Sequence, residues 1–199
     1  MMCLASRSPR RAQLLRQIGV PFWVSAADID ETPRANESPA VYVERMAREK
    51  AQALLASTNE VVLGADTSVI IDGQILGKPV DEQHAMDMLK LLSGRSHQVI
   101  SAVALAQRGP DGDRCETVVV MTDVQFAALS DAQIRNYIAT GEPNDKAGAY
   151  GIQGLGAVLV ESIQGSHSNV VGLPLYETAQ LLERWQVPLW QPSASQETA

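Results

Sequence analysis

Apolar residues near the start of the chain change from a short continuous run to a helical spacing. Met2 to Ala5 form the apolar run, which predicts a strand, and Ser8 followed by Pro9 is typical of a helix start. We expect that helix to continue to about Gly19, a residue suited to the left-handed conformation that ends helices. The chain therefore begins with a predicted strand, a tight turn and a helix N-terminus.

A second amphipathic helix is predicted after an acidic loop over residues 25 to 37. Ser38 and Pro39 repeat the helix-start pattern, and the helix is expected to continue to about Ala56. Helical spacing places four residues on one face: Val43, Ala47, Lys50 and Leu54. Three of the four are apolar, so this face predicts that Lys50 points inward.

The segment from Val61 to Ile71 is rich in strand-forming residues. Asp72 and Gly73 are typical of a two-residue hairpin turn, after which residues 74–76 return as a second strand. Asp66 lies in the middle of the first, apolar strand. A carboxylate in that position is the most informative single residue of the pattern.

The second half of the chain repeats these two patterns. Helices are expected from Asp81 to Leu92, from Ser130 (with Gln133 as a capping box) to Ile138, and from about Pro174 to Trp185. Strands are expected over residues 97–107, 115–128 and 157–163. The segment from Gly141 to Gly156 is rich in glycine, which indicates tight turns or close backbone approach to a ligand.

Composition narrows the class of protein. With 199 residues and 45% apolar content, the chain can bury a substantial core, and we expect one domain over residues 1–190 with a disordered tail over 191–199. No apolar stretch approaches the roughly 20 residues that span a bilayer, and no leader pattern is seen, so a cytoplasmic protein is expected. Cys3 and Cys115 lack the spacing of a zinc site and are interpreted as small apolar residues.

Charge argues against a nucleic-acid partner. The chain has 23 acidic and 16 basic side chains, a net charge of -7. Such a surface repels a polyanion overall, so any bound phosphate must lie in a local basic pocket.

Residues 6–11 form the first candidate for such a pocket. Ser6, Ser8 and the arginines of this segment bring two hydroxyls and two or three guanidiniums to backbone N–H groups at a helix N-terminus, which is the chemistry of an anion site. The alternative is an ordinary capped surface helix. Lys50 and Lys78 could reach the same phosphates; alternatively, Lys50 extends its ammonium to water and Lys78 is a plain turn residue.

Asp66 and Glu31 are candidate ligands of a divalent metal. A carboxylate in a central strand must be paired, protonated or bound to metal to offset its desolvation. Glu31 could join it, because Mg²⁺ prefers one or two carboxylates together with phosphate oxygens and water. The alternatives are a structural hydrogen bond for Asp66 and a solvated acidic loop for Glu31.

The isolated histidines are interpreted as helix surface (His84), polar strand face (His97) and loop (His167).

Several strings, in order along nearly the whole chain, resemble the Maf family. They are Leu4-Ala5-Ser6-Arg7-Ser8-Pro9-Arg10-Arg11, Asp30-Glu31-Thr32, Glu49-Lys50-Ala51, Gly64-Ala65-Asp66-Thr67, Gly77-Lys78-Pro79, the residues 145–154, and Asn169-Val170-Val171-Gly172-Leu173-Pro174. The resemblance implies a mixed α/β fold similar to the inosine triphosphate pyrophosphatases, with helices flanking an elongated twisted sheet and two lobes around a cleft.

The resemblance also implies an activity and a homodimer. Members of the family are hydrolases of nucleotide metabolism that cleave a nucleoside triphosphate between its α- and β-phosphates, with Mg²⁺, Mn²⁺ or Co²⁺ as the divalent metal. By the resemblance, Asp66 is the proton acceptor and, with Glu31, holds the metal. The triphosphate-binding positions would be Ser6, Ser8, Arg11, Lys50 and Lys78.

Three positions carry substrate specificity in the family, here Arg10, Thr67 and Gln153. This combination resembles the branch that acts on dTTP and UTP, rather than the branch that acts on 7-methyl-GTP. Two other classes of function stay open at this point. One is a nucleotide-binding regulator of cell division without turnover, and the other is a general phosphatase that releases orthophosphate.

Overall fold

The computed structural model describes residues 1–110 and 112–191. The tail predicted over 191–199 therefore lies outside the described residues except for its first position. No helix in the described part is both long enough and apolar enough to cross a membrane.

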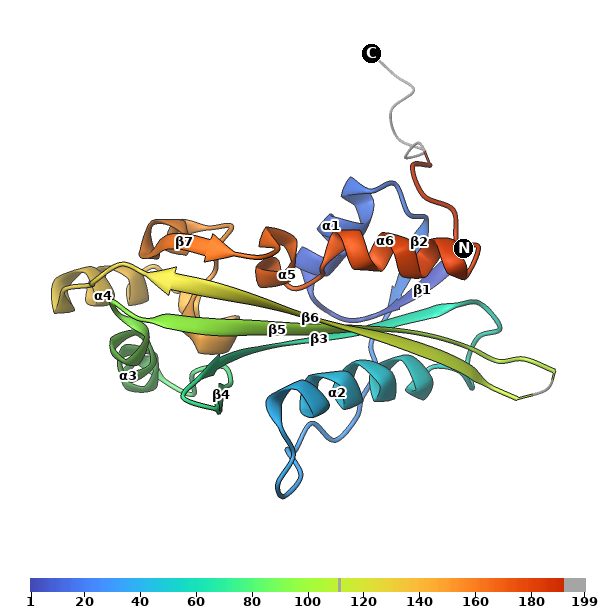
Figure 1. Cartoon of the computed structure of the whole chain (residues 1–199), viewed down its shortest axis with the longest axis horizontal. Coiled ribbons are helices and arrows are strands. Elements are labelled where there is room, and N and C mark those ends of the chain that lie inside the picture. Colours follow the sequence, from blue (N-terminus) through green and yellow to red (C-terminus); the bar gives the residue numbers. More distant parts are fainter. Residues whose placement is uncertain (111, 192–199) are drawn as a thin grey trace, which may run out of the picture. The chain divides into compact units, whose positions relative to one another are not determined.

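Strands and helices alternate along the chain (Figure 1). The strands are β1 (Met2–Ala5), β2 (Phe22–Ser25), β3 (Val62–Ile71), β4 (Gln74–Leu76), β5 (Ser96–Gln107), β6 (Arg114–Phe126) and β7 (Val160–Gln164). The α-helices are α1 (Pro9–Gln17), α2 (Pro39–Ala53), α3 (Glu82–Leu92), α4 (Asp131–Ile138), α5 (His167–Val171) and α6 (Leu175–Arg184). Three short 3-10 helices lie at Glu142–Asp145, Ala147–Ala149 and Leu155–Leu159.

The strands of the described chain form one seven-stranded mixed sheet in the order β2-β1-β3-β5-β6-β7, with β4 paired to β3. β1 is parallel to both β2 and β3, and β4 and β7 are antiparallel to their neighbours. β3 has neighbours on both sides, so Asp66 does lie in an interior strand. The mixed α/β class predicted from the sequence is confirmed, whereas the cleft between two lobes stays a prediction.

Residues of the chain group into two compact units. Unit 1 contains residues 1–66, 101–120 and the chain from Gly172 onwards, and unit 2 contains residues 67–100 and 121–171. Three strands, β3, β5 and β6, contribute residues to both units. The single domain predicted over residues 1–190 is a statement about cooperative folding and stays a prediction.

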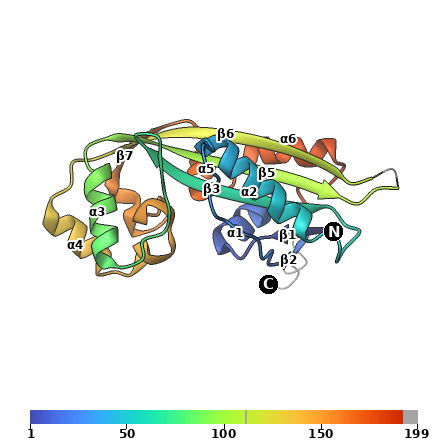
Figure 2. The same cartoon turned by 90° about the horizontal axis from the view of Figure 1, so that it is seen from below.

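In unit 1, helices cover both faces of the strands. Figures 1 and 2 show α2 on one face and α1 and α6 on the other. The contact between α2 and β3 requires glycine at position 64, because a Cβ there would collide with the carbonyl oxygen of Ala47 and lie 2.6 Å from the amide nitrogen of Ala51. This close approach places Lys50 of α2 over the strand that carries Asp66.

In unit 2, α3 packs against α4 (Figure 2), and both contribute to an apolar core. His97 of β5 lies within this unit and is only 3% exposed. Its ring makes edge contacts with the rings of Phe126 and Tyr150, at centroid distances of 5.0 and 5.4 Å. The polar strand face predicted for His97 is therefore wrong: its ring is a core side chain.

Most predicted elements are confirmed within a few residues, with four differences. β2 was not predicted, and α5 begins at His167, where a loop was expected. The strand expected over 157–163 begins only at Val160, because the preceding residues form a 3-10 helix. Ser38 is at the N-cap of α2, but its side chain makes no capping hydrogen bond.

Candidate active site

The turn between β1 and α1 is held by its two serine hydroxyls. The backbone N–H of Ser8 donates to Ser6 Oγ (3.2 Å), and the N–H of Arg11 donates to Ser8 Oγ (3.4 Å). Ser8 is the N-cap of α1 and Pro9 follows it, as the sequence predicts. The turn therefore presents the N-terminus of a helix, beside two serine hydroxyls, as an electropositive surface.

Arg11 is fixed at both ends of its guanidinium. Its Nη1 donates to Ser6 Oγ (3.1 Å), and its Nε donates to the carbonyl oxygen of Gly172 (3.0 Å), 161 positions away in the chain. Burial lowers the pKa of Arg11, the charges of Asp66 and Glu31 oppose that shift, and the neighbouring Arg10 adds to it. Arg11 is thus a preoriented cation within electrostatic reach of both predicted metal ligands.

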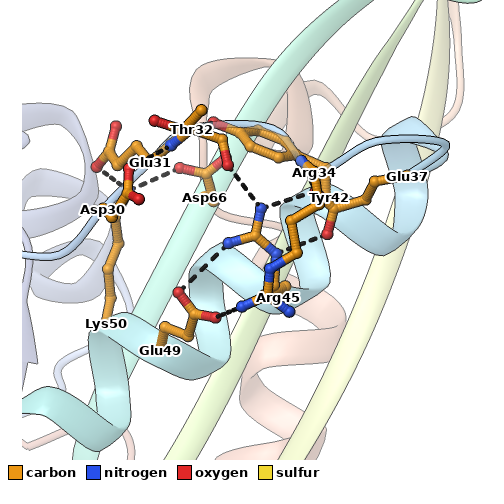
Figure 3. Close-up of polar contacts among 10 residues, drawn as sticks. All are labelled: Asp30, Glu31, Thr32, Arg34, Glu37, Tyr42, Arg45, Glu49, Lys50 and Asp66. Atoms are coloured by element: carbon orange, nitrogen blue, oxygen red, sulfur yellow. Dashed lines mark hydrogen bonds and ion pairs between the residues drawn. The ribbon is translucent and has the colours of Figure 1, made fainter.

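Lys50 joins Glu31 and Asp66. Its Nζ lies 2.8 Å from Glu31 Oε1 and 2.8 Å from Asp66 Oδ1 (Figure 3). The Lys50 and Asp66 side chains are 12% and 13% exposed, so both charges are largely removed from water. Lys50 therefore points inward, as its helical position predicts, and its ammonium meets two carboxylates rather than bulk solvent.

The loop that carries Glu31 is tied to α2 by a second ion pair. Arg45 donates to both oxygens of Glu37, from Nε at 2.6 Å and from Nη2 at 2.7 Å, and these side chains are 11% and 5% exposed. Arg45 Nη2 also donates to the carbonyl oxygen of Thr32 (3.1 Å). The hydroxyl of Tyr42 donates to the carbonyl oxygen of Glu31 itself (2.9 Å). We call Arg45, Glu37 and Tyr42 the loop clamp (Figure 3).

The carboxylates fit a divalent ion that also takes ligands from a substrate. Among the described residues, no group of three or more His, Cys, Asp or Glu side chains could hold a metal alone. Glu31 and Asp66, however, converge on a single cationic atom, Lys50 Nζ. Two carboxylates at one point are the protein share of a typical Mg²⁺ site, whose remaining ligands are phosphate oxygens and water.

Of the other predicted site residues, Arg10 lies in the first turn of α1 in unit 1 and is half-buried, and the remaining three belong to unit 2. Thr67 follows Asp66 directly in β3 and is half-buried. Lys78 follows β4 and is exposed, and Gln153 is exposed in the loop after the second 3-10 helix. Within unit 1 the structure joins Ser6, Ser8 and Arg11 in one hydrogen-bonded group, and Glu31, Lys50 and Asp66 in another.

Sequence patterns missed the residues that orient this site. Arg45 has a visible local signal, since Glu49 follows it at a helical i,i+4 spacing and the two make an ion pair of 3.4 Å. Its stronger partner, Glu37, precedes the helix and gives no periodic signal. The Gly172 carbonyl that holds Arg11 has no local signal at all, because the contact joins opposite ends of the chain.

Known proteins match this chain along most of its length. The family model described as "Maf-like protein" matches residues 1–185. This chain belongs to the Maf family. A dTTP/UTP pyrophosphatase of Pseudoalteromonas atlantica is 53% identical over 189 residues, which are 92% of this chain and 96% of that protein. A dTTP/UTP pyrophosphatase of Alcanivorax borkumensis is 56% identical over 195 residues, covering 96% of this chain and 98% of the relative.

Solved structures also match this Maf-family chain, at lower identity. The Ham1 protein of Staphylococcus aureus matches with a TM-score of 0.46 and 16% identity, over 63% of this chain and 71% of that chain. A nucleoside-triphosphatase / dITP/XTP pyrophosphatase of Mycobacterium abscessus matches with a TM-score of 0.44 and 17% identity, over 93% of this chain and 94% of that chain.

Proposed function

We propose that this protein hydrolyses dTTP and UTP to the nucleoside monophosphate and pyrophosphate. One observation in the structure carries the proposal: Asp66 and Glu31 converge on Lys50 in the same unit as the serine–arginine turn, and both carboxylates act electrostatically on Arg11. Carboxylates and fixed cations in one place are the groups that phosphoanhydride hydrolysis needs. The names of the two relatives above support the choice of nucleotides.

Asp66 is the proposed proton acceptor. One water molecule hydrolyses the anhydride bond between the α- and β-phosphates. Its oxygen forms a bond to the α-phosphorus, the bond from that phosphorus to the bridging oxygen breaks, and pyrophosphate leaves the nucleoside monophosphate. The proton of that water passes to Asp66. The ion pair with Lys50, at 2.8 Å, fixes the orientation of the carboxylate that accepts this proton.

The cations of unit 1 are proposed to bind and stabilise the triphosphate. Ser6, Ser8 and the first turn of α1 offer hydroxyls and N–H groups to phosphate oxygens. Arg11 keeps its orientation through Gly172 and presents a guanidinium of fixed position to the phosphates. Lys50 offsets negative charge that develops on the leaving pyrophosphate. Lys78 is predicted by the family resemblance to act on the same substrate.

A divalent metal is part of the proposal. Glu31 and Asp66 would hold it, and when bound it would neutralise charge on the triphosphate and polarise its phosphorus centre. Pyrophosphate release measured with Mg²⁺, Mn²⁺ and Co²⁺ in turn identifies the preferred ion.

Base recognition is assigned to Arg10, Thr67 and Gln153. Uracil and thymine present a carbonyl–imide–carbonyl edge, which a side-chain amide can pair with through complementary hydrogen bonds. A site built on such bonds rejects a base that leaves its polar groups unpaired. Gln153, as an exposed amide, has the required donors and acceptor.

The first test is pyrophosphate release from dTTP, UTP, CTP, dCTP and 7-methyl-GTP, with Mg²⁺ and with chelator. We expect release from dTTP and UTP that chelator abolishes. Asp66→Asn should lower kcat by about 10²-fold or more while nucleotide binding persists, since general-base assistance is worth about that much.

Two results would contradict the proposal. Release of orthophosphate in place of pyrophosphate would indicate a general phosphatase. Nucleotide binding without any turnover would favour a regulatory protein, such as one acting in cell division. Asp72→Asn is a suitable control for Asp66→Asn, because it makes the same chemical change at an exposed carboxylate of the hairpin turn. The ion pair of Asp72 with Arg95 lies at the surface.

The proposal also includes a cellular location, the cytoplasm, and an assembly, a homodimer. Both cysteines, Cys3 and Cys115, are free thiols, as expected in the reducing cytoplasm where nucleoside triphosphates are made and used. A homodimer is proposed by analogy with the family, and light scattering of the purified protein measures it directly.

A further inference from the structure

The loop that carries Gln153 is built around the carboxylate of Glu142. Glu142 Oε2 accepts a hydrogen bond from the backbone N–H of Leu155 (2.8 Å), and Oε1 accepts one from the N–H of Gly156 (2.9 Å). Both oxygens are therefore engaged by consecutive backbone amides on the C-terminal side of Gln153. Figure 1 shows this part of the chain between α4 and β7.

Tyr137 of α4 holds the other side of the loop. Its hydroxyl donates to Glu142 Oε1 (2.9 Å) and accepts from the backbone N–H of Gly151 (3.1 Å), two residues before Gln153. We call Glu142 and Tyr137 the loop frame. It fixes the backbone before and after Gln153, while the amide side chain itself is exposed.

Glycines in the loop allow this close approach. A Cβ on Gly154 would collide with the carboxylate of Glu142, and a Cβ on Gly156 would lie 2.6 Å from the Tyr137 hydroxyl oxygen. Neither glycine has a positive φ that would otherwise explain its presence. The glycine-rich character of the segment therefore follows from contact with the loop frame, in addition to the turns that it makes.

The surroundings of Glu142 favour the charged form of its carboxylate. Burial by itself would raise the pKa of Glu142, but the N–H groups of Gly156 and Leu155, the Tyr137 hydroxyl and the charge of Lys146 together hold that pKa below its usual value. Burial and the Glu142 carboxylate raise the pKa of Tyr137, so its phenol keeps the proton that it donates. Hydrogen bonds to a carboxylate are about twice as strong as those between neutral groups.

We propose that Glu142 and Tyr137 are positioning residues for base selection, which act by fixing the backbone on both sides of Gln153. The proposal rests on the function proposed above, in which Gln153 pairs with the pyrimidine ring. A recognition amide on a loop that shifts by about 1 Å loses directional hydrogen bonds, whereas most of the proposed phosphate-binding groups lie on other elements, in the turn before α1, on α1 and on α2. Loss of the frame should thus reduce discrimination between bases more than it reduces turnover.

Two substitutions test the proposal independently. Glu142→Gln preserves size but replaces one acceptor oxygen by an NH₂ group, so one backbone N–H loses its partner. Tyr137→Phe preserves the ring and removes the hydroxyl that joins Glu142 to Gly151. Glu161→Gln is the matched control, because Glu161 is an exposed carboxylate on β7 and its substitution makes the same change of charge.

The measurement is kcat/KM for UTP and CTP, and for dTTP and dCTP, in each variant. For both frame variants we expect the ratio of UTP to CTP to fall by about tenfold, with kcat for UTP within about threefold of wild type. Faster hydrogen exchange should accompany the change, at the amide of Leu155 or Gly156 in Glu142→Gln and at the amide of Gly151 in Tyr137→Phe, because these are the amides that lose their acceptor. Glu161→Gln should match wild type in all of these readouts.

Unchanged ratios in both variants, with the exchange of those amides accelerated, would overturn the proposal. So would an equal loss of kcat/KM for all four nucleotides, because that result indicates a purely structural role. Wild type supplies the baseline that separates the two proposals. Absence of UTP turnover in wild type contradicts the function itself, whereas wild-type turnover with unaffected variants contradicts only the role of the frame.

Discussion

At the scale of single residues, the two ion pairs of Lys50 have equal lengths but differ in burial, and burial decides which of them contributes more. Its distances to Glu31 and Asp66 are the same, 2.8 Å, but Glu31 is 58% exposed and Asp66 is 13% exposed. An exposed ion pair contributes about 0–1 kcal/mol, because water and salt screen it. The pair with Asp66 therefore dominates, and the position of Glu31 depends mainly on its own loop.

His97 is a second case in which a residue's surroundings decide its role. Its Nε2 lies 2.8 Å from the hydroxyl of Tyr150, and its Nδ1 has no hydrogen-bond partner among the described residues. Burial lowers the pKa of His97 from 6.5 to about 4. The ring is therefore neutral at physiological pH and acts as a packing residue with one polar contact.

This pKa predicts a loss of stability in mild acid. The unfolded chain takes up the His97 proton near pH 6.5 and the folded chain only near about 4, so stability is greatest above pH 6.5 and falls as the pH decreases toward 4. Linkage gives a loss of about 2 kcal/mol between about pH 7.5 and 5. Urea unfolding at these two pH values measures this change in the free energy of unfolding. Both values lie above the usual titration range of carboxylates, so the change reports mainly on histidine.

His97→Gln should remove most of that pH dependence, because glutamine does not titrate. His167→Gln is the control, since His167 is exposed at the start of α5 and should leave the dependence intact. Equal pH slopes in wild type and His97→Gln would mean that other groups titrate in this range.

At the scale of elements, the loop clamp makes the segment between β2 and α2 part of the active site. The Arg45–Glu37 pair has two hydrogen bonds and is nearly buried, so it is both directional and weakly screened. Arg45 and Tyr42, both on α2, hold the carbonyl oxygens of Thr32 and Glu31. Helix α2 therefore supplies Lys50 and also fixes the loop that presents Glu31.

Arg45→Lys tests this coupling. A lysine keeps the charge but cannot bind a carboxylate with two parallel bonds, so the loop should loosen while α2 stays folded. We expect kcat/KM for UTP to fall by about tenfold, the lower end of the effect of residues that orient metal ligands. Apparent affinity for Mn²⁺, measured by titration calorimetry with a non-hydrolysable nucleotide, should fall with it.

Arg48→Lys is the matched control for that experiment. Arg48 lies on the same helix and pairs with Glu44 at 2.6 Å, but its side chain is 48% exposed. An unchanged kcat/KM in Arg45→Lys, or an equal decrease in Arg48→Lys, would show that the clamp does not position Glu31.

At the scale of the whole molecule, three strands run through both compact units, and each unit contains a different kind of spectroscopic probe. β3, β5 and β6 each pass from one unit to the other, so neither unit contains a complete set of sheet strands. The chain has 3 tryptophans and 3 histidines. By residue number, Trp23, Trp185 and Trp190 belong to unit 1, and His84, His97 and His167 belong to unit 2.

These probes test the predicted single cooperative domain. Because unfolding either unit breaks strands of the other, we expect tryptophan fluorescence and histidine NMR signals to report the same urea midpoint and the same slope. Transitions separated by more than the error of the fit would instead define two units that unfold independently.

Local sequence patterns were sufficient to predict most of the helices and strands, and the motifs were sufficient to predict the family. Ser8-Pro9, Asp72-Gly73 and the pair Ser130/Gln133 act on the backbone within a few residues, so the first helix, the hairpin and the capping box were predictable. The inward direction of Lys50 followed from helical spacing for the same reason. The motifs along the chain were sufficient for the Maf family.

Which of these groups come into contact could be seen only once the chain was folded. The carbonyl oxygen that holds Arg11, the carboxylate that holds the loop around Gln153 and the burial of His97 all depend on contacts between distant segments or different elements. Such contacts depend on the path of the whole chain, and local spacing contains no information about that path. A 3-10 helix also replaced the first residues of the strand predicted over 157–163, and Glu142, from a different element, binds the backbone N–H groups of the first two residues of that helix.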